Sequence, residues 1–429
     1  GGYMSGHHVI ASIVTLTAAS SYINHKLFRL PQAIGLTLIT LFLSILVLGA
    51  ASFGMHFAES IKQMVIGFEF NDAFLHGMLG FLLFAVSMHV DFQELNKQKW
   101  LVLLLATLSV LISTGIIGTA FWVITKIAGL SISLGFCFLF GALISPTDPI
   151  AVLTLLKRFK VPKHLEANFA GEALFNDAMA IVLFVVILGF TVEEGSVWST
   201  THILTYFFQQ GMGGIVFGVL LGSLAVYLLR GIDTYELAIL ITLAIVSGGY
   251  ALADSVLNVS GVITMAVSGL MVGGGCHHYK RCQKTIDRLD SFWMLVDDLL
   301  NAILFVIIGL EFIQLSFIGV GLGLCLSVLA VVIGARWISV YVPMKVVAWK
   351  CTPSLGIVNL MTWGGIRGGI AIALALTIPD SFERNIIVSL TYFVVIFSIV
   401  VQGLTLEHLV KKIVDFRMSW CETIRKNKQ

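Results

Sequence analysis

The sequence predicts an all-α polytopic membrane protein that crosses the bilayer about thirteen times. Of its 429 residues, 58% are apolar and only 12% are charged, whereas a soluble domain carries about 25% charged residues. Apolar stretches of about 20 residues, the length that crosses a hydrocarbon core, recur along the whole chain. We therefore expect one membrane unit over residues 1–429, which excludes a soluble enzyme with a single membrane anchor.

The predicted spans are apolar runs bounded by charged residues, glycine or proline. Each is taken as one transmembrane helix. In chain order they cover residues 8–24, 33–53, 71–90, 100–125, 131–156, 165–190, 203–229, 235–253, 259–275, 292–312, 316–344, 354–378 and 386–410.

Basic residues predict the orientation, because lysine and arginine are retained in cytoplasmic loops. With the N-terminus outside, only Lys62, Lys126 and Arg384 fall in outside loops. Arg336 and Arg367 lie within spans. The rest of the 26 basic residues fall in the cytoplasmic loops and the C-terminal tail. One missed or extra span would reverse this asymmetry further along the chain. The pattern therefore supports thirteen spans with a cytoplasmic C-terminus.

The fifth span contains a break. Pro146 and Pro149 flank Thr147 and Asp148, and each proline removes an amide donor and clashes with a preceding carbonyl. Irregular backbone at membrane depth is tolerated only against protein or a water-filled cavity. A carboxylate and a hydroxyl beside freed carbonyls offer hard oxygen ligands, which suit small cations. We therefore favour a cation site over a simple proline kink.

The twelfth span is broken as well, by the sequence Gly-Gly-Ile-Arg-Gly-Gly at 364–369. Paired glycines weaken a helix, although they also allow close helix packing. Spans 1–6 and 8–13 form two sets of six, and the broken span is fifth in each. An offset of seven spans makes the sets run in opposite directions. We therefore expect two inverted repeats of six helices, with the interrupted fifth and twelfth helices crossing near the membrane midplane.

Three further charges lie inside spans. Helical rise places Glu172 and Arg336 both about 12 Å from the cytoplasmic ends of their spans, which predicts a buried ion pair with a structural role. Arg367 lies about 20 Å deep, level with Asp177. It is placed either to offset negative charge at the site or to lie against the dipoles of the broken helix ends.

Asp177, in the middle of the sixth span, is the predicted carrier. A carboxylate in a poorly hydrated cavity holds a proton more readily than one in water. Asp177 could then hold either a proton or a metal cation, but not both, and this exclusion suffices for exchange if the empty carboxylate cannot cross the barrier. Asn176 beside it is neutral. A single titrating group favours a one-for-one, electrically silent cycle.

At these residues the chain resembles a known family. The likeness is to the NhaP/NHE-type sodium/proton antiporters of the cation/proton antiporter superfamily, and it covers essentially the whole membrane domain. The motifs that carry it are Thr147-Asp148-Pro149, Gly171-Glu172-Ala173-Leu174-Phe175-Asn176-Asp177, Phe292-Trp293 with Leu299-Leu300-Asn301 and Gly309-Leu310-Glu311, and Trp363-Gly364-Gly365-Ile366-Arg367-Gly368-Gly369.

The resemblance implies a homodimer in which a core domain moves elevator-fashion against a dimerisation domain. We expect the core within residues 71–190 and 292–410, and the dimerisation or scaffold helices mainly within 8–53 and 203–275. Residues 411–429 would form a short cytoplasmic tail. Because this tail lacks the long regulatory domain of animal exchangers, we expect a bacterial inner membrane.

The resemblance also implies site residues and partners. The transported ions are Na⁺ (or Li⁺) and H⁺, with no cofactor, and the surroundings are membrane lipid. The implied ion- and proton-binding residues are Asp177, Asp148, Asn176 and Thr147, of which Asp177, Asp148 and Thr147 would be the Na⁺ ligands, and the implied supporting charges are Glu172, Arg336 and Arg367.

Other functions remain open to different degrees. A K⁺/H⁺ antiporter of the same architecture needs the same kind of site, and Ala173, where members often have serine, leaves the cation preference open. An ion channel would give currents that scale with voltage, whereas a silent exchanger would ignore it. We expect no enzyme, because His-Glu-x-x-His and Gly-x-Ser-x-Gly are absent from the sequence. Nucleic-acid binding is not expected, because the basic residues follow the topology and form no patch.

Overall fold

The computed structural model describes most of the chain. The described residues are 6–66, 78–90, 99–148, 152–153, 156, 163–192, 200–232, 234–276, 283–314, 320–347 and 355–411. Within these ranges the regular structure is helical, apart from an isolated antiparallel bridge between Asp148 and Ile366. The predicted all-α class is confirmed.

Fifteen α-helices have both their ends within the described residues. Their bounds are α1 (Gly6–Ile23), α2 (Gln32–Ser52), α3 (His56–Ile66), α5 (Leu79–Met88), α7 (Lys99–Ile127), α8 (Leu134–Ile144), α10 (Lys163–Val192), α11 (Thr200–Leu229), α12 (Tyr235–Ala251), α13 (Gly261–Cys276), α14 (Gln283–Glu311), α15 (Leu322–Val347), α16 (Leu355–Trp363), α17 (Gly369–Leu376) and α18 (Phe382–Phe397). Short π-helical turns at 24–28, 252–256 and 398–402 continue α1, α12 and α18.

Many of these helices suit a membrane. Eight helical segments of the described chain are long and apolar enough to cross one, and three shorter apolar helices accompany them. This agrees with a multi-pass membrane protein. The count of thirteen and the inverted repeats go beyond this observation and stay predictions. The tail at 412–429 and parts of the predicted spans 71–90 and 131–156 lie outside the described residues.

Three of the differences between the predicted spans and the helices bear on the site. The range 131–156 contains α8, which ends at Ile144, and the range 354–378 is divided into α16 and α17. Both divisions fall at the proline and glycine breaks. The range 292–312 was too short, because α14 already begins at Gln283. Its first residues are charged and therefore carry no apolar signal, although they continue the helix.

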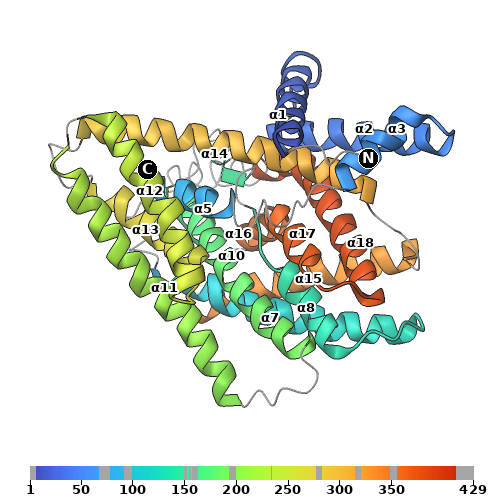
Figure 1. Cartoon of the computed structure of the whole chain (residues 1–429). Coiled ribbons are helices and arrows are strands. Elements are labelled where there is room, and N and C mark those ends of the chain that lie inside the picture. Colours follow the sequence, from blue (N-terminus) through green and yellow to red (C-terminus); the bar gives the residue numbers. More distant parts are fainter. Residues whose placement is uncertain are drawn as a thin grey trace, which may run out of the picture.

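The packing brings the two broken helices into the middle of the molecule. Helix α7 packs against α8, α10 and α15, while α17 packs against α18 and α8. On another side, α13 packs against α5 and α11, and α14 packs against both α5 and α2. Figure 1 shows α11, α12 and α13 grouped apart from α8, α17 and α18, with the long α14 passing both groups.

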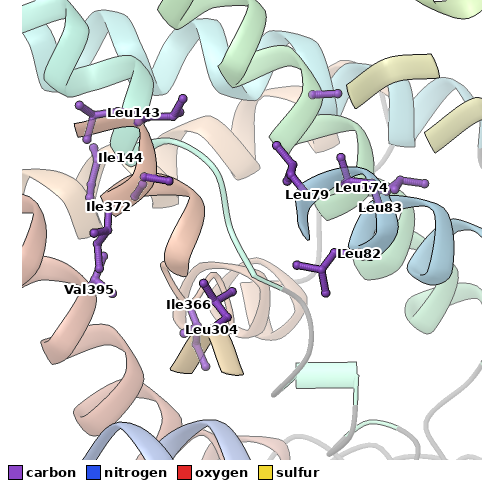
Figure 2. Close-up of a cluster of buried hydrophobic side chains, with 14 of the residues drawn as sticks. Leu79, Leu82, Leu83, Leu143, Ile144, Leu174, Leu304, Ile366, Ile372 and Val395 are labelled. Atoms are coloured by element: carbon purple, nitrogen blue, oxygen red, sulfur yellow. The ribbon is translucent and has the colours of Figure 1, made fainter. Parts of the chain in front are cut away.

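Buried apolar side chains surround the break. Leu143 and Ile144 at the end of α8 lie beside Ile372 of α17 and Val395 of α18 (Figure 2), and all four are almost fully buried. Helix α8 approaches α7 closely, because a Cβ at Gly141 would lie 2.6 Å from the carbonyl oxygen of Thr114. Such close packing stabilises helices in lipid, where burial of apolar surface supplies little driving force.

Candidate functional site

The two interrupted helices meet through their main chains. The amide of Asp148 donates a hydrogen bond to the carbonyl of Ile366, with an N···O distance of 2.7 Å. This antiparallel contact exists because Pro146 stops α8 and the glycines of 364–368 separate α16 from α17. A backbone amide of one break thus pairs with a backbone carbonyl of the other, and buried backbone groups require such partners.

An arginine lies at the carboxyl end of each half-helix. The guanidinium of Arg367 donates to the carbonyls of Ser145 and Pro146, directly after α8. Arg336 of α15 donates to the carbonyl of Met361 in the last turn of α16, at 3.4 Å. A cation at a helix C-terminus is stabilised by the unpaired carbonyls and the helix dipole. The position of Arg367 therefore agrees with its expected contact with a broken helix end.

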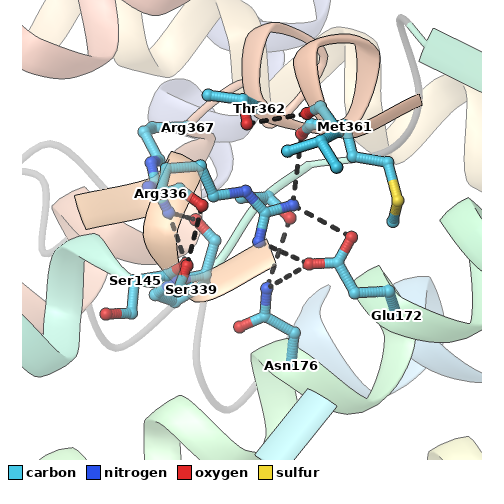
Figure 3. Close-up of polar contacts among 11 residues, drawn as sticks. Ser145, Glu172, Asn176, Arg336, Ser339, Met361, Thr362 and Arg367 are labelled. Atoms are coloured by element: carbon cyan, nitrogen blue, oxygen red, sulfur yellow. Dashed lines mark hydrogen bonds and ion pairs between the residues drawn. The ribbon is translucent and has the colours of Figure 1, made fainter. Parts of the chain in front are cut away.

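Glu172 and Arg336 form a bidentate ion pair. Arg336 Nη1 lies 2.5 Å from Glu172 Oε1, and Nη2 lies 2.9 Å from Oε2. The two side chains are 1% and 3% exposed. The two residues predicted from their matching depths to pair are therefore in contact. Figure 3 shows the pair between α10 and the end of α16.

Asn176 supports this network and does not line the cavity. Its amide nitrogen donates to Thr147 Oγ1 at 3.3 Å and to Glu172 Oε1 at 3.4 Å. Figure 3 shows the bond to Glu172. The side chain is fully buried. It therefore joins the first broken helix to the ion pair. The predicted site residues Thr147, Asp148 and Asp177 do reach the cavity, whereas Asn176 does not.

A cavity of about 70 Å³ lies beside the crossing. A site needs roughly 10–15 Å³ of such space for each water, so several waters or a partly hydrated cation fit. Its polar wall contains Thr147, Asp148 and Asp177, and its apolar wall contains leucines from α5, α10 and α14. Leu79, Leu82, Leu83, Leu174 and Leu304 are among them (Figure 2).

Asp177 has the features of a binding group. It is 8% exposed, yet it lines the cavity. Its Oδ1 atom is buried and accepts no hydrogen bond from the described residues. A buried acceptor without a donor is costly unless something else satisfies it. A proton on the carboxyl group or a small cation beside it would do so.

Asp148 lies next to the N-terminus of α17. A Cβ added to Gly368, the residue before α17, would lie 2.9 Å from the Cβ of Asp148. The free amides at the start of a helix and its dipole stabilise a nearby negative charge. The carboxylate can therefore remain charged in the membrane interior. Together with Thr147 and Asp177 it offers oxygen ligands of the type that small, hard cations prefer.

Two cavity residues were not predicted as site residues. Asp297 and Asn301 of α14 also line the cavity. The predicted span starts at residue 292, which puts Asp297 near a helix end, where a solvated carboxylate is expected. The apolar segment in fact runs from Asp287 to Glu311. The usable signal was the spacing, because an aspartate and an asparagine four residues apart lie on one helix face.

The comparisons with known proteins cover nearly the whole chain. A family profile described as "Sodium/hydrogen exchanger, transmembrane" matches residues 12–412. The Na⁺/H⁺ antiporter NhaP of Pseudomonas aeruginosa is 40% identical over 412 residues, which are 94% of this chain and 96% of that protein. The Na⁺/H⁺ antiporter NhaH of Halobacillus aidingensis is 32% identical over 421 residues, 95% of this chain and 98% of that one.

A solved structure shows the same fold. The sodium proton antiporter MjNhaP1 from Methanocaldococcus jannaschii superposes with a TM-score of 0.73. The superposition covers 96% of this chain and 100% of the other, at 20% sequence identity. Sequence and fold therefore agree over the same length of chain.

Proposed function

Because this chain belongs to the sodium/hydrogen exchanger family, we propose that it exchanges Na⁺ or Li⁺ for H⁺ as a secondary active antiporter. Its relatives are transporters, so the chain is a membrane transporter and not an enzyme. The bacterial relatives support a bacterial inner membrane as its location. The N-terminus would lie outside and the C-terminus in the cytoplasm, as the basic residues predict.

The exchange depends on competition at Asp177. Its buried Oδ1, which accepts no hydrogen bond from the described residues, is the observation that carries the proposal. When a cation is held by Asp177 with Asp148 and Thr147, the carboxylate has no place for a proton. When the proton is bound, the charge that holds the cation is gone. Each ion can therefore leave only as the other arrives.

A one-for-one cycle follows from the charges around Asp177. Asn176 is neutral and faces the Glu172–Arg336 pair. Glu172 is fully engaged with its arginine, and the N-terminus of α17 stabilises the negative charge of Asp148. Asp177 is then the carboxylate that changes state. Na⁺ moved one way and H⁺ moved the other carry equal charge, so the cycle is electrically silent.

Alternating access would move the crossing as one unit. The bond between Asp148 and Ile366 links the two breaks, and this supports a rigid core that carries the site (residues 71–190 and 292–410). The scaffold (8–53 and 203–275) would stay in place and form the homodimer. Helix α11 exposes several large apolar side chains, which suits a surface covered by lipid or by a second copy.

The test is an ion panel in proteoliposomes with a trapped pH dye. Addition of Na⁺ or Li⁺ to the wild type is expected to move protons, while choline is not. Asp177→Asn is expected to abolish this movement, because an amide neither binds a proton nor attracts a cation in the same way. The variant must elute as a folded protein in size-exclusion chromatography. A folded Asp177→Asn protein that still exchanges ions would refute Asp177 as the carrier.

K⁺/H⁺ exchange is the second candidate and the same panel decides it. Ala173 lines the cavity with a methyl group, so this stretch of wall supplies no side-chain oxygen. With one side-chain oxygen fewer in the wall, the preference between Na⁺ and K⁺ is left to the experiment. Proton movement driven by K⁺ and not by Na⁺ would assign the chain to potassium.

A further inference from the structure

A third carboxylate shares the cavity with Asp148 and Asp177. Asp297 comes from α14, whereas the other two come from the first break and from α10. It lies ten residues inside the apolar segment that begins at Asp287, at about 15 Å along the helix. A carboxylate at this depth is costly unless it meets water or a partner. The cavity has room for water beside it.

Asn301 orients this carboxylate. Its Nδ2 atom donates to Asp297 Oδ1 at 2.8 Å, and both side chains line the cavity. Asn301 is 7% exposed, so the amide is held within the protein, whereas Asp297 is half-buried. The amide is neutral, and the pair keeps one full negative charge. Asp297 is therefore held in place without being neutralised by this partner.

The three carboxylates influence one another electrostatically. Asp148 lies close enough to interact with both Asp177 and Asp297. Asp297 also interacts with its neighbour Asp298 and with His89, the residue that follows α5. Among the described residues that line the cavity, none is a lysine, arginine or histidine. A confined space with acidic walls concentrates cations.

We propose that Asp297, oriented by Asn301, is a capture site that draws the hydrated monovalent cation into the cavity where Asp177 binds it. The proposal rests on the exchange function above. Asp297 lies on α14, whose Gln283 end the predicted topology places in the cytoplasm. His89, whose ring contacts the carbonyl of Asp290 at 3.1 Å, lies toward the same end. A cation that enters the cavity would meet the charge of Asp297 as well as that of Asp177.

The experiment measures exchange against cation concentration in everted membrane vesicles, whose outer face is the cytoplasmic one. Asp297→Asn is expected to raise the half-saturating Na⁺ concentration roughly three- to tenfold, with the maximal rate kept within about twofold, because it removes one attracting charge and leaves the carrier intact. Asp297→Glu is expected to restore most of the affinity. Added choline chloride, which screens the charge, is expected to weaken the wild type more than Asp297→Asn.

Asp298→Asn is the matched control. Asp298 is the next residue and carries the same charge, but it points about 100° away around the helix. Its side chain is exposed and does not line the cavity. The half-saturating Na⁺ concentration of Asp298→Asn is expected to match that of the wild type.

Three outcomes would overturn the proposal. They are an unchanged half-saturating concentration in Asp297→Asn, an equal rise in Asp298→Asn, and loss of exchange at every Na⁺ concentration in folded Asp297→Asn. The last would make Asp297 part of the carrier itself. A second measurement, stabilisation of the detergent-purified protein by NaCl relative to choline chloride, does not require transport. If the wild type moves no protons, the proposed exchange is refuted. The NaCl concentration that gives half of the maximal stabilisation still tests the capture site, because it is expected to rise in Asp297→Asn.

Discussion

Glu172 and Arg336 each do more than pair with one another. Glu172 also accepts from Asn176, and Arg336 also donates to the last turn of α16. The pair thus connects α10, α15 and α16 at the depth of the crossing. Because both side chains are buried, the removal of one leaves the other without its compensating charge.

Single replacement of either residue is expected to destabilise the protein strongly. Glu172→Gln or Arg336→Met alone should cost about 3–5 kcal/mol, which is the usual loss when a buried pair is broken. The double variant Glu172→Gln/Arg336→Met is expected to be less damaged than the sum of the two, since it strands no charge. Membrane yield and melting temperature in detergent measure the effect. Normal yield and melting of both single variants would refute a stabilising pair.

At this scale the depth of a residue could be predicted, but the direction of its side chain could not. Helical rise converts position into depth, so Glu172 and Arg336 could be matched from the sequence. The turning of Asn176 away from the cavity depends on Thr147 and Glu172 as acceptors, which are set by packing. Asp297 was not predicted as a site residue because the first nine residues of α14, several of them charged, were left out of the predicted span. The predicted bounds therefore put Asp297 near a helix end.

At the level of the helices, the site depends on a close approach between the break before α17 and the break after α8. A Cβ at Gly368 would meet the Cβ of Asp148 at 2.9 Å and its Oδ2 at 3.0 Å. Gly368→Ala is therefore expected to displace Asp148 and lower the exchange rate by at least about tenfold, since small misplacements of reacting groups have large effects. Initial rates at saturating Na⁺ measure this loss.

Gly334→Ala provides the control for this change. Gly334 lies within α15, and a Cβ there would meet nothing within 4 Å. The added methyl group favours the helix slightly, so exchange and yield are expected to match the wild type. Equal rates for Gly368→Ala and Gly334→Ala would show that the close approach at Asp148 does not matter for transport.

The two breaks could be located from sequence because proline and glycine act locally on the backbone. The ends of α8 and α16 lie where Pro146 and the glycines of 364–368 predict them. The pairing of Asp148 with Ile366 could not be predicted in the same way. It depends on the relative shift of two helices that are far apart in the chain, and local propensities carry no information on this shift.

Two helix contacts in the described part of the chain agree with the predicted inverted repeats. Helices α2 and α14 pack together, as do α5 and α13. In the predicted order these are spans two and ten, and spans three and nine. A shift of seven spans converts the first pairing into the second. An internal symmetry of this kind would explain why each half has its break in its fifth span.

The predicted orientation can be tested with single cysteines. In a variant without the six native cysteines, Ala128→Cys follows α7 and Gly231→Cys follows α11. Both positions are exposed in the described structure. A membrane-impermeant maleimide added to whole cells is expected to label Ala128→Cys and not Gly231→Cys, and everted vesicles should reverse the pattern. The opposite labelling pattern would show that the chain has the reverse orientation in the membrane.

Electrical silence is a property of the complete cycle. The initial rate of Na⁺/H⁺ exchange is expected to stay the same when potassium and valinomycin set the membrane potential from zero to strongly negative values. The reason is that Asp177 carries one unit of positive charge in each direction. A rate that changes in proportion to the imposed potential would contradict the one-for-one cycle and would favour a channel or an unequal exchange.

The link between Asp148 and Ile366 has a bearing on how such a protein could arise. Half of the chain contributes Thr147, Asp148 and Asp177, while the other half contributes the carbonyl that holds Asp148 and the arginines beside the two breaks. Neither half could build this centre by itself. If both halves descend from one six-helix ancestor, that ancestor would have needed two copies in opposite orientations to form such a centre.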